Sequence, residues 1–152
     1  MHKVAIVMGS KSDMAIAEKA AEVLKEFAIK YEINVISAHR NPNKIRSFAT
    51  GAADNGIGVV IAIAGLAAHL PGVIASMTLL PVIGVPGSGG PLNGQDALYS
   101  IVQMPSGIPV ACVGIGNAKN AALLSVQILS LSVPELVEKM RSYRQQFGDD
   151  AA

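Results

Sequence analysis

Short apolar runs alternate with segments of helical periodicity along this chain. Most of the runs are nearly continuous, which is typical of strands buried on both faces of a parallel sheet. The segments between them place apolar side chains three or four residues apart, the spacing of one face of a helix. Strands are therefore expected at Lys3–Met8, Tyr31–Ile36, Val59–Ile63, Val82–Val85 and Pro109–Val113.

Six helices are predicted between and after these strands. The first covers residues 13–27 and the second runs from Pro42 to about residue 54. Asn41 is the expected N-cap of the second helix, and Pro42 suits its first position because the N–H that proline lacks has no intrahelical partner there. The remaining helices are expected from residue 70, over 93–103, over 117–131 and over 135–147.

This alternation of strands and helices predicts a three-layer α/β/α fold with a doubly wound parallel sheet. Because crossovers between parallel strands are right-handed, few strand orders remain, and we expect the flavodoxin-like one. Neither a repeat nor a linker divides the sequence, so residues 1–152 are expected to form one domain. An extra C-terminal helix at residues 132–147 has no strand after it. It either folds back on its own chain or packs on a neighbouring subunit, and the low charge of the sequence favours the second.

The composition favours a self-associating protein of the cytoplasm. Hydrophobic residues make up 51% of the chain and charged residues 15%, so apolar surface is expected to be covered by further copies. The most apolar segment, Ile57–Val73, is interrupted by glycine and proline, whereas a membrane span needs roughly 20 mainly apolar residues. The start of the chain has no signal-peptide pattern. We therefore expect a cytoplasmic homo-oligomer without membrane contact.

Other partners and cofactors are disfavoured by the residue types present. The net charge is +1 and tryptophan is absent, whereas nucleic-acid binding needs a basic stripe or stacking aromatic side chains. The single cysteine, Cys112, excludes an internal disulfide and a cysteine-based zinc site. No carboxylate or cysteine accompanies His2, His39 and His69 at metal-ligand spacing, so no metal site is expected.

Two polar clusters follow directly on predicted strands. Gly9-Ser10-Lys11-Ser12-Asp13 follows the first strand, and Ser37-Ala38-His39-Arg40 follows the second. The carboxyl ends of neighbouring parallel strands meet at one sheet edge, and helix N-termini there attract anions. The two clusters together offer hydroxyls for a phosphate, a carboxylate for a sugar, a guanidinium for a second anion and an imidazole.

The first cluster also has a simpler interpretation, as a helix start with Ser12 or Asp13 as the N-cap. A second serine, Ser10, exceeds what a cap requires, and Gly9 permits close approach of a ligand to the backbone. The spacing matches neither the glycine-lysine loop of nucleoside triphosphatases nor the dinucleotide fingerprint. A monophosphate or a sugar phosphate is therefore the expected ligand.

Both histidines of the predicted sheet edge are candidates for chemistry. A lone histidine is more often structural, but His39 stands between Ser37 and Arg40 at a strand end, which favours a general acid or base. His69 lies among small residues in Gly65–Gly72, and either a supporting role or a catalytic one fits it. The glycine-rich segment Pro86–Pro91 also follows a strand and is a candidate lid.

Five motifs, in order and with family-like spacing, give the chain a specific resemblance. Nearly the whole sequence resembles the class I phosphoribosylaminoimidazole carboxylase catalytic subunit, or 5-(carboxyamino)imidazole ribonucleotide mutase (the PurE family). The motifs are Met8-Gly9-Ser10-Lys11-Ser12-Asp13, Ser37-Ala38-His39-Arg40, Ala67-Ala68-His69-Leu70-Pro71-Gly72, Pro81-Val82-Ile83-Gly84-Val85-Pro86 and Ser100-Ile101-Val102-Gln103-Met104-Pro105.

The resemblance implies an isomerase of de novo purine synthesis. The carboxyl group of a ribonucleotide carbamate would move to the neighbouring ring carbon, with His39 as acid and then base in a closed, dry pocket. The resemblance also implies no metal or cofactor, and a homo-octamer. The residues implied to bind substrate are Ser10, Ser12, Asp13, Ser37, Arg40, Gly65, Ala67, His69 and Leu70.

The chain departs from the family pattern at the candidate pocket. Ile63 and Leu66 occupy positions where the family usually has glycine, and the segment Gly87–Pro91 is richer in glycine than usual. Two other functions stay open on the residues alone. One is the class II reaction, direct carboxylation of aminoimidazole ribonucleotide with free carbon dioxide, although that class lacks the Ala-Ala-His-Leu-Pro-Gly run. The other is a non-catalytic, nucleotide-binding flavodoxin-like module.

Overall fold

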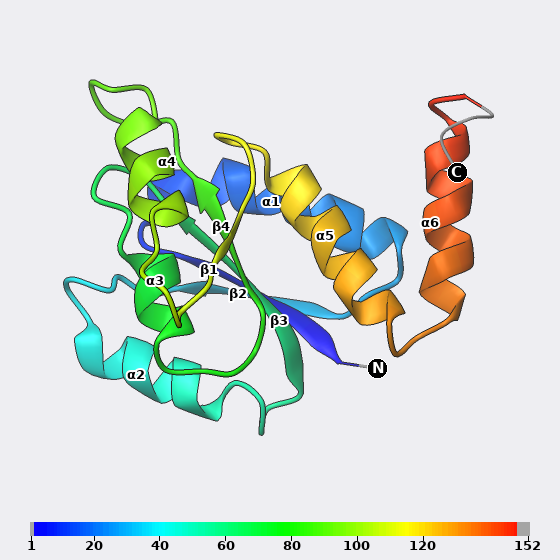
Figure 1. Cartoon of the computed structure of the whole chain (residues 1–152), viewed down its shortest axis with the longest axis horizontal. Helices are drawn as coiled ribbons and strands as arrows, with labels where there is room; N and C mark the ends of the chain where they lie inside the picture. Colours follow the sequence, from blue (N-terminus) through cyan, green and yellow to red (C-terminus); the bar gives the residue numbers. More distant parts are fainter. Residues whose placement is uncertain (1, 149–152) are drawn as a thin grey trace.

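The computed structural model describes residues 2–148, so Met1 and residues 149–152 of the expected 1–152 unit lie outside the described part. Five parallel strands form one sheet in the order β2-β1-β3-β4-β5, which confirms the doubly wound, flavodoxin-like prediction (Figure 1). The elements are β1 Lys3–Met8, η1 Lys11–Asp13, α1 Met14–Glu26, β2 Tyr31–Val35, α2 Pro42–Gly51, β3 Ile57–Ala64, α3 Leu70–Ala75, β4 Val82–Pro86, α4 Gln95–Val102, β5 Ala111–Cys112, α5 Ala118–Ser130 and α6 Glu135–Gln145.

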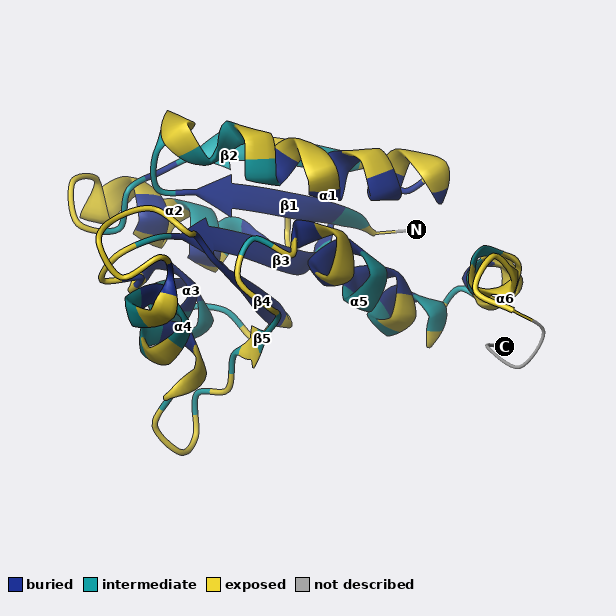
Figure 2. Ribbon diagram, turned by 90° about the horizontal axis from the view of Figure 1, so that it is seen from above, coloured by how far each residue is buried: buried dark blue, intermediate teal, exposed yellow. Residues whose placement is uncertain are grey.

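The two faces of the sheet carry separate cores because successive strand residues point to opposite sides. In β1, Val4, Ile6 and Met8 face α1 and α5, whereas Ala5 and Val7 face the layer made by α2, α3 and α4. All five of these side chains are fully buried. Figure 2 shows the buried strands between the two helical layers. The continuous apolar runs of the sequence thus follow from burial on both faces.

Predicted and observed boundaries differ at several elements, among them α2 and β5. The helix α2 ends at Gly51 rather than near residue 54, because the chain turns there and the Ile57 N–H already donates to the Ala52 carbonyl. The strand β5 spans two residues instead of the five predicted. It is an edge strand whose only partner is β4, and Pro109 has no N–H to donate to a ladder.

The C-terminal helix is shorter than predicted and packs against α5 and the end of α1. It begins at Glu135, directly after Pro134, and the chain from Leu131 to that proline forms turns rather than helix. Figures 1 and 2 both place α6 on the side away from the carboxyl ends of the strands. Its contacts to the body include the buried Leu136 and a hydrogen bond from Lys139 Nζ to the Phe27 carbonyl, 2.9 Å long.

No helix in residues 2–148 is both long and apolar enough to cross a bilayer. The longest, α1 and α5, have 13 residues each. A span of the hydrocarbon core needs roughly 20.

An ion pair ties the edge strand β2 to its neighbour. Lys3 Nζ on β1 donates to Glu32 Oε2, and Asn34 Nδ2 donates to Glu32 Oε1 at 2.9 Å. The hydrogen bond from Lys3 lowers the pKa of Glu32 below its ordinary value, and the amide of Asn34 acts in the same direction. Charged side chains on an exposed edge also hinder its pairing with another chain.

This ion pair predicts a specific pH dependence of the unfolding free energy. Because the folded-state pKa of Glu32 is lowered, its contribution is present above the unfolded pKa of about 4.3 and is lost as pH falls through the folded value. Glu32→Gln should therefore lower the unfolding free energy at neutral pH by about 0.2–1 kcal/mol and flatten its fall in acid. Urea unfolding between pH 3 and 7 measures both effects.

The matched control is Glu22→Gln, an exposed glutamate on α1. It should leave the acid dependence as it is in the parent chain. If the unfolding free energy of Glu32→Gln fell as steeply with decreasing pH as that of the parent chain, the ion pair would contribute nothing to stability.

Candidate functional site

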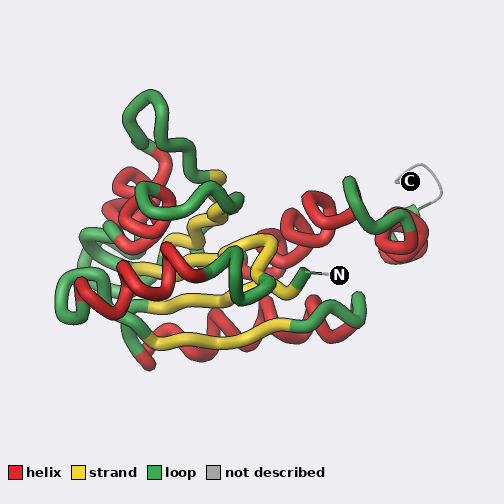
Figure 3. The backbone as a smooth tube through the Cα atoms, turned by 90° about the horizontal axis from the view of Figure 1, so that it is seen from below, coloured by secondary structure: helices red, strands yellow, loops and turns green. Residues whose placement is uncertain are grey.

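A cavity of about 590 Å³ opens at the sheet edge where β1, β2, β3 and β4 end. Parallel register brings these four carboxyl ends to one edge of the sheet (Figure 3). Residues of the loops that follow them line the cavity. All ten residues predicted for the site line this single cavity. They are Ser10, Ser12, Asp13, Ser37, His39, Arg40, Gly65, Ala67, His69 and Leu70.

The cavity is also lined by six residues that were not among those predicted for the site from the sequence. Most carry no functional group, so residue chemistry alone offered no signal for them. The glycine-rich segment after β4 was the exception, since its composition predicts a lid candidate. The six are Gly9, Ala38, Ala64, Leu66, Gly89 and Gly90.

Ser10 shapes the turn between β1 and α1. Its Oγ accepts a hydrogen bond from the Ser12 N–H at 3.3 Å and thereby caps the short helix η1. Asp13 precedes α1 but makes no side-chain capping bond. Because Ser10 uses a lone pair for the cap, its hydroxyl hydrogen remains available to donate to an anion. The side chain that caps this helix start is thus Ser10, and not the predicted Ser12 or Asp13.

Ser37 and Arg40 connect the loops after β2 and β1. Ser37 Oγ accepts from the Arg40 N–H at 3.2 Å and from Arg40 Nε at 3.3 Å, and Arg40 Nη2 donates to the Gly9 carbonyl at 3.4 Å. These contacts hold a permanent positive charge beside the cavity. Ser37 Oγ, like Ser10 Oγ, accepts hydrogen bonds from N–H groups of the protein. Each of these hydroxyls can therefore donate its own hydrogen to a negatively charged group.

The helix α2 starts at the predicted residues, with Asn41 as N-cap and Pro42 as its first residue, but without a side-chain cap. Asn41 occupies the N-cap position and its carbonyl accepts from the Ile45 N–H, but its side chain makes no capping hydrogen bond. The Ser37 carbonyl, four residues earlier, accepts from the Asn41 N–H at 2.9 Å. Backbone turns and the fixed φ of Pro42 therefore start this helix in place of a side-chain cap.

The two histidines are in direct contact. His39 Nε2 and His69 Nδ1 lie 2.7 Å apart, and the rings meet edge to face at 84° with their centroids 4.9 Å apart. Nitrogens at this distance share one hydrogen, so one ring donates and the other accepts. A single proton can therefore be held between two rings that face one cavity.

Both histidines are exposed, as is Arg40. The expectation of a closed, dry pocket around a partly buried His39 is therefore wrong for the single chain. The reason is the size of the side chains around the two rings, since Ala38, Gly65 and Ala67 are too small to cover them.

Asp13 is the carboxylate of the site. Partial burial raises its pKa above the ordinary value, because removal from water disfavours the charged form. A Cβ built on Gly87 would lie 3.5 Å from Asp13 Oδ1, so the lid segment passes close to this carboxylate. A ligand hydroxyl that donates to Asp13 would compensate for the water it has lost.

The loops after β3 and β4 pack backbone against backbone. The Gly87 N–H donates to the Ala64 carbonyl at 2.9 Å, and a Cβ on Gly87 would lie 3.3 Å from both Gly65 Cα and Gly65 N. Leu66, in the first of these loops, has φ +55°, a left-handed conformation that costs a non-glycine residue about 1–2 kcal/mol. This strain lies at the cavity, where local strain often accompanies function.

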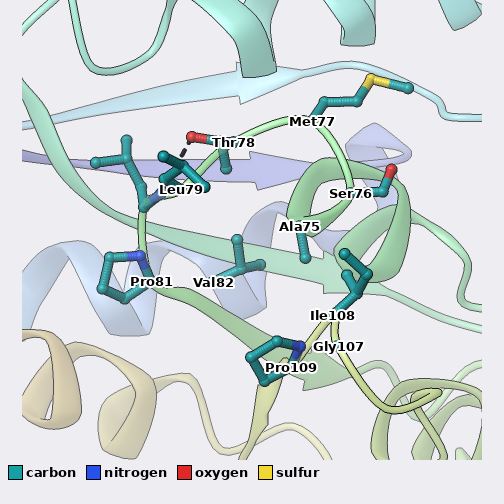
Figure 4. A pocket seen from close by; sticks show the side chains of 11 residues that line it. Ala75, Ser76, Met77, Thr78, Leu79, Pro81, Val82, Gly107, Ile108 and Pro109 are labelled. Carbon is teal, nitrogen blue, oxygen red and sulfur yellow. Dashed lines mark hydrogen bonds between the residues drawn. The ribbon is translucent and has the colours of Figure 1, made fainter.

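A second cavity of about 600 Å³ lies near the opposite ends of the strands, beside the start of β4 (Figure 4). Its walls are residues 75–82 and 107–109, and the Leu80 N–H donates to Thr78 Oγ1 at 3.2 Å within it. None of these residues titrates near neutral pH. This second cavity thus offers no acid or base for proton transfer, and the cavity of His39 is the candidate active site.

Turns rich in hydroxyl groups and a histidine pair at one edge of a doubly wound α/β sheet are typical of enzymes that bind nucleotides or sugar phosphates and use acid–base chemistry. Comparison with known proteins narrows that class. The family model described as AIR carboxylase matches residues 3–150, and the chain belongs to this family.

Curated relatives are similar over most of their length. An N5-carboxyaminoimidazole ribonucleotide mutase of Pyrococcus abyssi is 57% identical, over 95% of this chain and 83% of the relative. A mutase of the same name from Escherichia coli is 51% identical, over 97% of this chain and 89% of the relative. The crystal structure of Treponema denticola PurE superposes with a TM-score of 0.88 at 36% identity, over 97% of this chain and 92% of that one.

The raised pKa of Asp13 predicts opposite effects on stability and binding. A raised folded-state pKa means that stability is full below the unfolded pKa of about 3.9 and is lost as pH rises through the folded value. Asp13→Asn should therefore leave the unfolding free energy at pH 7 unchanged or higher. It should weaken binding of a ribonucleoside 5′-monophosphate about tenfold, because a charged acceptor is lost.

Urea unfolding and titration calorimetry measure the two effects on the same samples. Asp54→Asn, in an exposed turn, is the matched control and should change neither. Lower stability of Asp13→Asn together with unchanged binding would assign Asp13 to the helix start alone.

Proposed function

We propose that this protein moves a carboxyl group within a nucleotide, from the exocyclic nitrogen of 5-(carboxyamino)imidazole ribonucleotide to the neighbouring ring carbon. The product is 4-carboxy-5-aminoimidazole ribonucleotide, an intermediate of de novo purine biosynthesis. The protein is thus an isomerase of the mutase type. Membership of the AIR carboxylase family and mutase relatives at 51–59% identity support this function.

One observation of the structure carries the proposal, the contact of His39 with His69 on the wall of the cavity. A module that only binds nucleotides has no need of two imidazoles in hydrogen-bond contact. Direct carboxylation with free carbon dioxide is not favoured, because seven relatives at 51–59% identity over most of their length are named mutases.

The phosphate and ribose of the substrate are assigned to the loops after β1 and β2. Ser10, Ser12 and Ser37 offer hydroxyls and Arg40 a guanidinium, so together they suit the phosphate or the migrating carboxylate. Asp13 is assigned to the ribose hydroxyls, whose donated hydrogen bonds would stabilise its charged form.

The imidazole ring of the substrate is assigned to the loop after β3. Gly65 and Ala67 have little or no side chain, so a planar ring can approach the backbone closely. Leu70 is buried and supplies an apolar floor. This placement brings the reacting nitrogen and carbon next to the two histidines, which line the same cavity.

His39 is assigned the proton transfers. The bond between nitrogen and the carboxyl carbon breaks, its electron pair stays on nitrogen, and His39 supplies the proton that makes the amine. The electron-rich ring carbon then attacks the released carbon dioxide, and His39 removes the proton from that carbon. The sequence is redox-neutral and ends with His39 in its starting state, as acid–base catalysis requires.

His69 is assigned the role of partner to His39. The 2.7 Å contact fixes the ring of His39 and lets the pair hold one proton between the two nitrogens. When His39 gives up a proton to the substrate, His69 can replace it, and the reverse transfer follows when His39 acts as base. No metal and no cofactor takes part in this scheme.

The reaction itself is tested by mixing the protein with the carbamate ribonucleotide in the absence of ATP, metal and bicarbonate. Formation of the carbon-carboxylated product, followed by absorbance, would establish the mutase function. Product only from aminoimidazole ribonucleotide and carbon dioxide would establish direct carboxylation instead. Tight nucleotide binding without product in either mixture would indicate a binding module.

His39→Asn is expected to keep nucleotide affinity within about twofold and to lower turnover at least about a hundredfold, because the ring position is filled but proton transfer is lost. Calorimetry and steady-state kinetics measure the two quantities. His2→Asn, at an exposed histidine outside the cavity, is the control and should behave as the parent. Near-normal turnover of His39→Asn would remove this residue from the mechanism.

We further propose that the protein works as a homo-octamer in the cytoplasm and that residues 132–147 contact a neighbouring subunit. Several large apolar side chains are exposed in the single chain, which supports burial against further copies. Leu131, where α5 ends, and Phe147, just after α6, are 89% and 68% exposed. Leu79, beside the apolar cavity of Figure 4, is also fully exposed.

Ending the chain after Leu131 is expected to lower the number of subunits per assembly, as calculated from the mass that light scattering measures. The full-length chain with Leu131→Ser and Phe147→Ser should show the same change, and it keeps the contacts of Leu136 and Lys139 that the shortened chain loses. Far-UV circular dichroism verifies that both variants are folded. An unchanged mass in both would show that α6 is no part of an interface.

A further inference from the structure

Leu66 occupies an unusual place in the cavity of His39. It lines the cavity, yet 53% of it is exposed, so its side chain stands at the rim. Among the described residues that line this cavity it is the only large apolar one at the rim, since Leu70 is buried and the other exposed members are small or polar. Its backbone is left-handed, with φ +55°, where glycine would be unstrained.

The side chain of Leu66 is held across the rim by the glycine-rich segment after β4. A Cβ built on Gly90 would lie 2.3 Å from Leu66 Cδ2, so the leucine methyl group rests directly on the glycine backbone. Gly90 itself has φ +85°. A side chain at position 90 would have to displace the leucine methyl group, and the contact joins the loops after β3 and β4 at the rim of the cavity that the two histidines line.

The chemistry proposed above needs such a cover. After the carbamate is cleaved, the carbon dioxide is a small apolar molecule beside two exposed imidazoles. The carbon dioxide either reacts with the ring carbon or escapes to solvent. An apolar side chain at the rim slows both this escape and the entry of water. Glycine at position 66 would provide no such cover.

We infer that Leu66, seated on Gly90, sets the fraction of released carbon dioxide that is captured as product. It touches neither of the proton-transfer groups through a hydrogen bond and acts by closing the rim. The inference rests on the proposed mutase function, and it concerns the partition of the intermediate rather than the occurrence of the reaction.

The test uses Leu66→Gly and Leu66→Ala with substrate carrying ¹³C in the carbamate carbon, in buffer with unlabelled bicarbonate and carbonic anhydrase. Two quantities are measured, the ratio of carbon-carboxylated product to aminoimidazole ribonucleotide and the ¹³C content of that product. Spontaneous loss of carbon dioxide is subtracted with an enzyme-free sample. Leu92→Ala is the matched control, since Leu92 is 55% exposed and does not line the cavity.

Leu66→Gly is expected to lower the product ratio about threefold and to lower ¹³C retention in the same direction, while substrate consumption changes less than twofold. Leu66→Ala should show a smaller effect of the same kind, and Leu92→Ala should match the parent. The thermal midpoint of Leu66→Gly should not fall much, because glycine relieves the left-handed strain and little buried surface is lost.

A double-mutant cycle tests the contact itself. Gly90→Ala should lower the product ratio in the parent chain, where its new methyl group displaces Leu66, and should have little effect in the Leu66→Gly chain. The strain of alanine at Gly90 is common to both backgrounds and cancels.

Product formation by the parent chain separates the two hypotheses. If the parent makes product and Leu66→Gly matches it in ratio and label retention, the role of Leu66 is wrong and the mutase function stands. If Gly90→Ala acts equally in both backgrounds, the contact with Leu66 is not responsible. A parent that makes no product from the carbamate overturns the mutase function and the role of Leu66 together.

Discussion

The parallel register of β1 with both of its neighbours is the constraint on which the site depends. Met8, the last residue of β1, pairs with Val35 on one side and with Ile63 on the other, so three strands end at the same level. The loops after these strands therefore start next to one another, although they are separated by tens of residues in the sequence. The hydrogen bond from Arg40 to the Gly9 carbonyl and the contact of His39 with His69 follow from this alignment.

The residues of the site contribute less to the stability of the folded chain than the sheet that supports them. Asp13 has a raised pKa because it is partly buried, and Leu66 adopts a left-handed backbone. Neither feature stabilises the folded chain. Both are tolerated because the strands below them are fully buried between two helical layers, and because the backbone of Gly87 is fixed to the Ala64 carbonyl. A rigid sheet thus presents strained and desolvated groups to a ligand.

Much of the fold and of the cavity lining could be predicted from local patterns. Apolar runs identified all five strands, and the position of Ser10, Asp13, His39 and Arg40 directly after two of them placed these residues at one edge. The errors arose where long-range strand pairing or local backbone turns, and not residue type, set the outcome. The strand β5 is short because it pairs with β4 alone, and Pro109 cannot donate to a ladder. The side chain of Asn41 makes no capping hydrogen bond, because backbone turns start α2.

By itself, the sequence determined the fold class, the motifs that mark the family and the residue types gathered at the sheet edge, because these depend on hydrophobic periodicity and on motif order. Only the tertiary structure decided which of those groups touch. The 2.7 Å contact of His39 with His69, the bracing of Arg40 by Ser37 and the seating of Leu66 on Gly90 all depend on how loops from different strands meet. Side-chain contacts of this kind depend on distances in space, and no spacing along the chain encodes them.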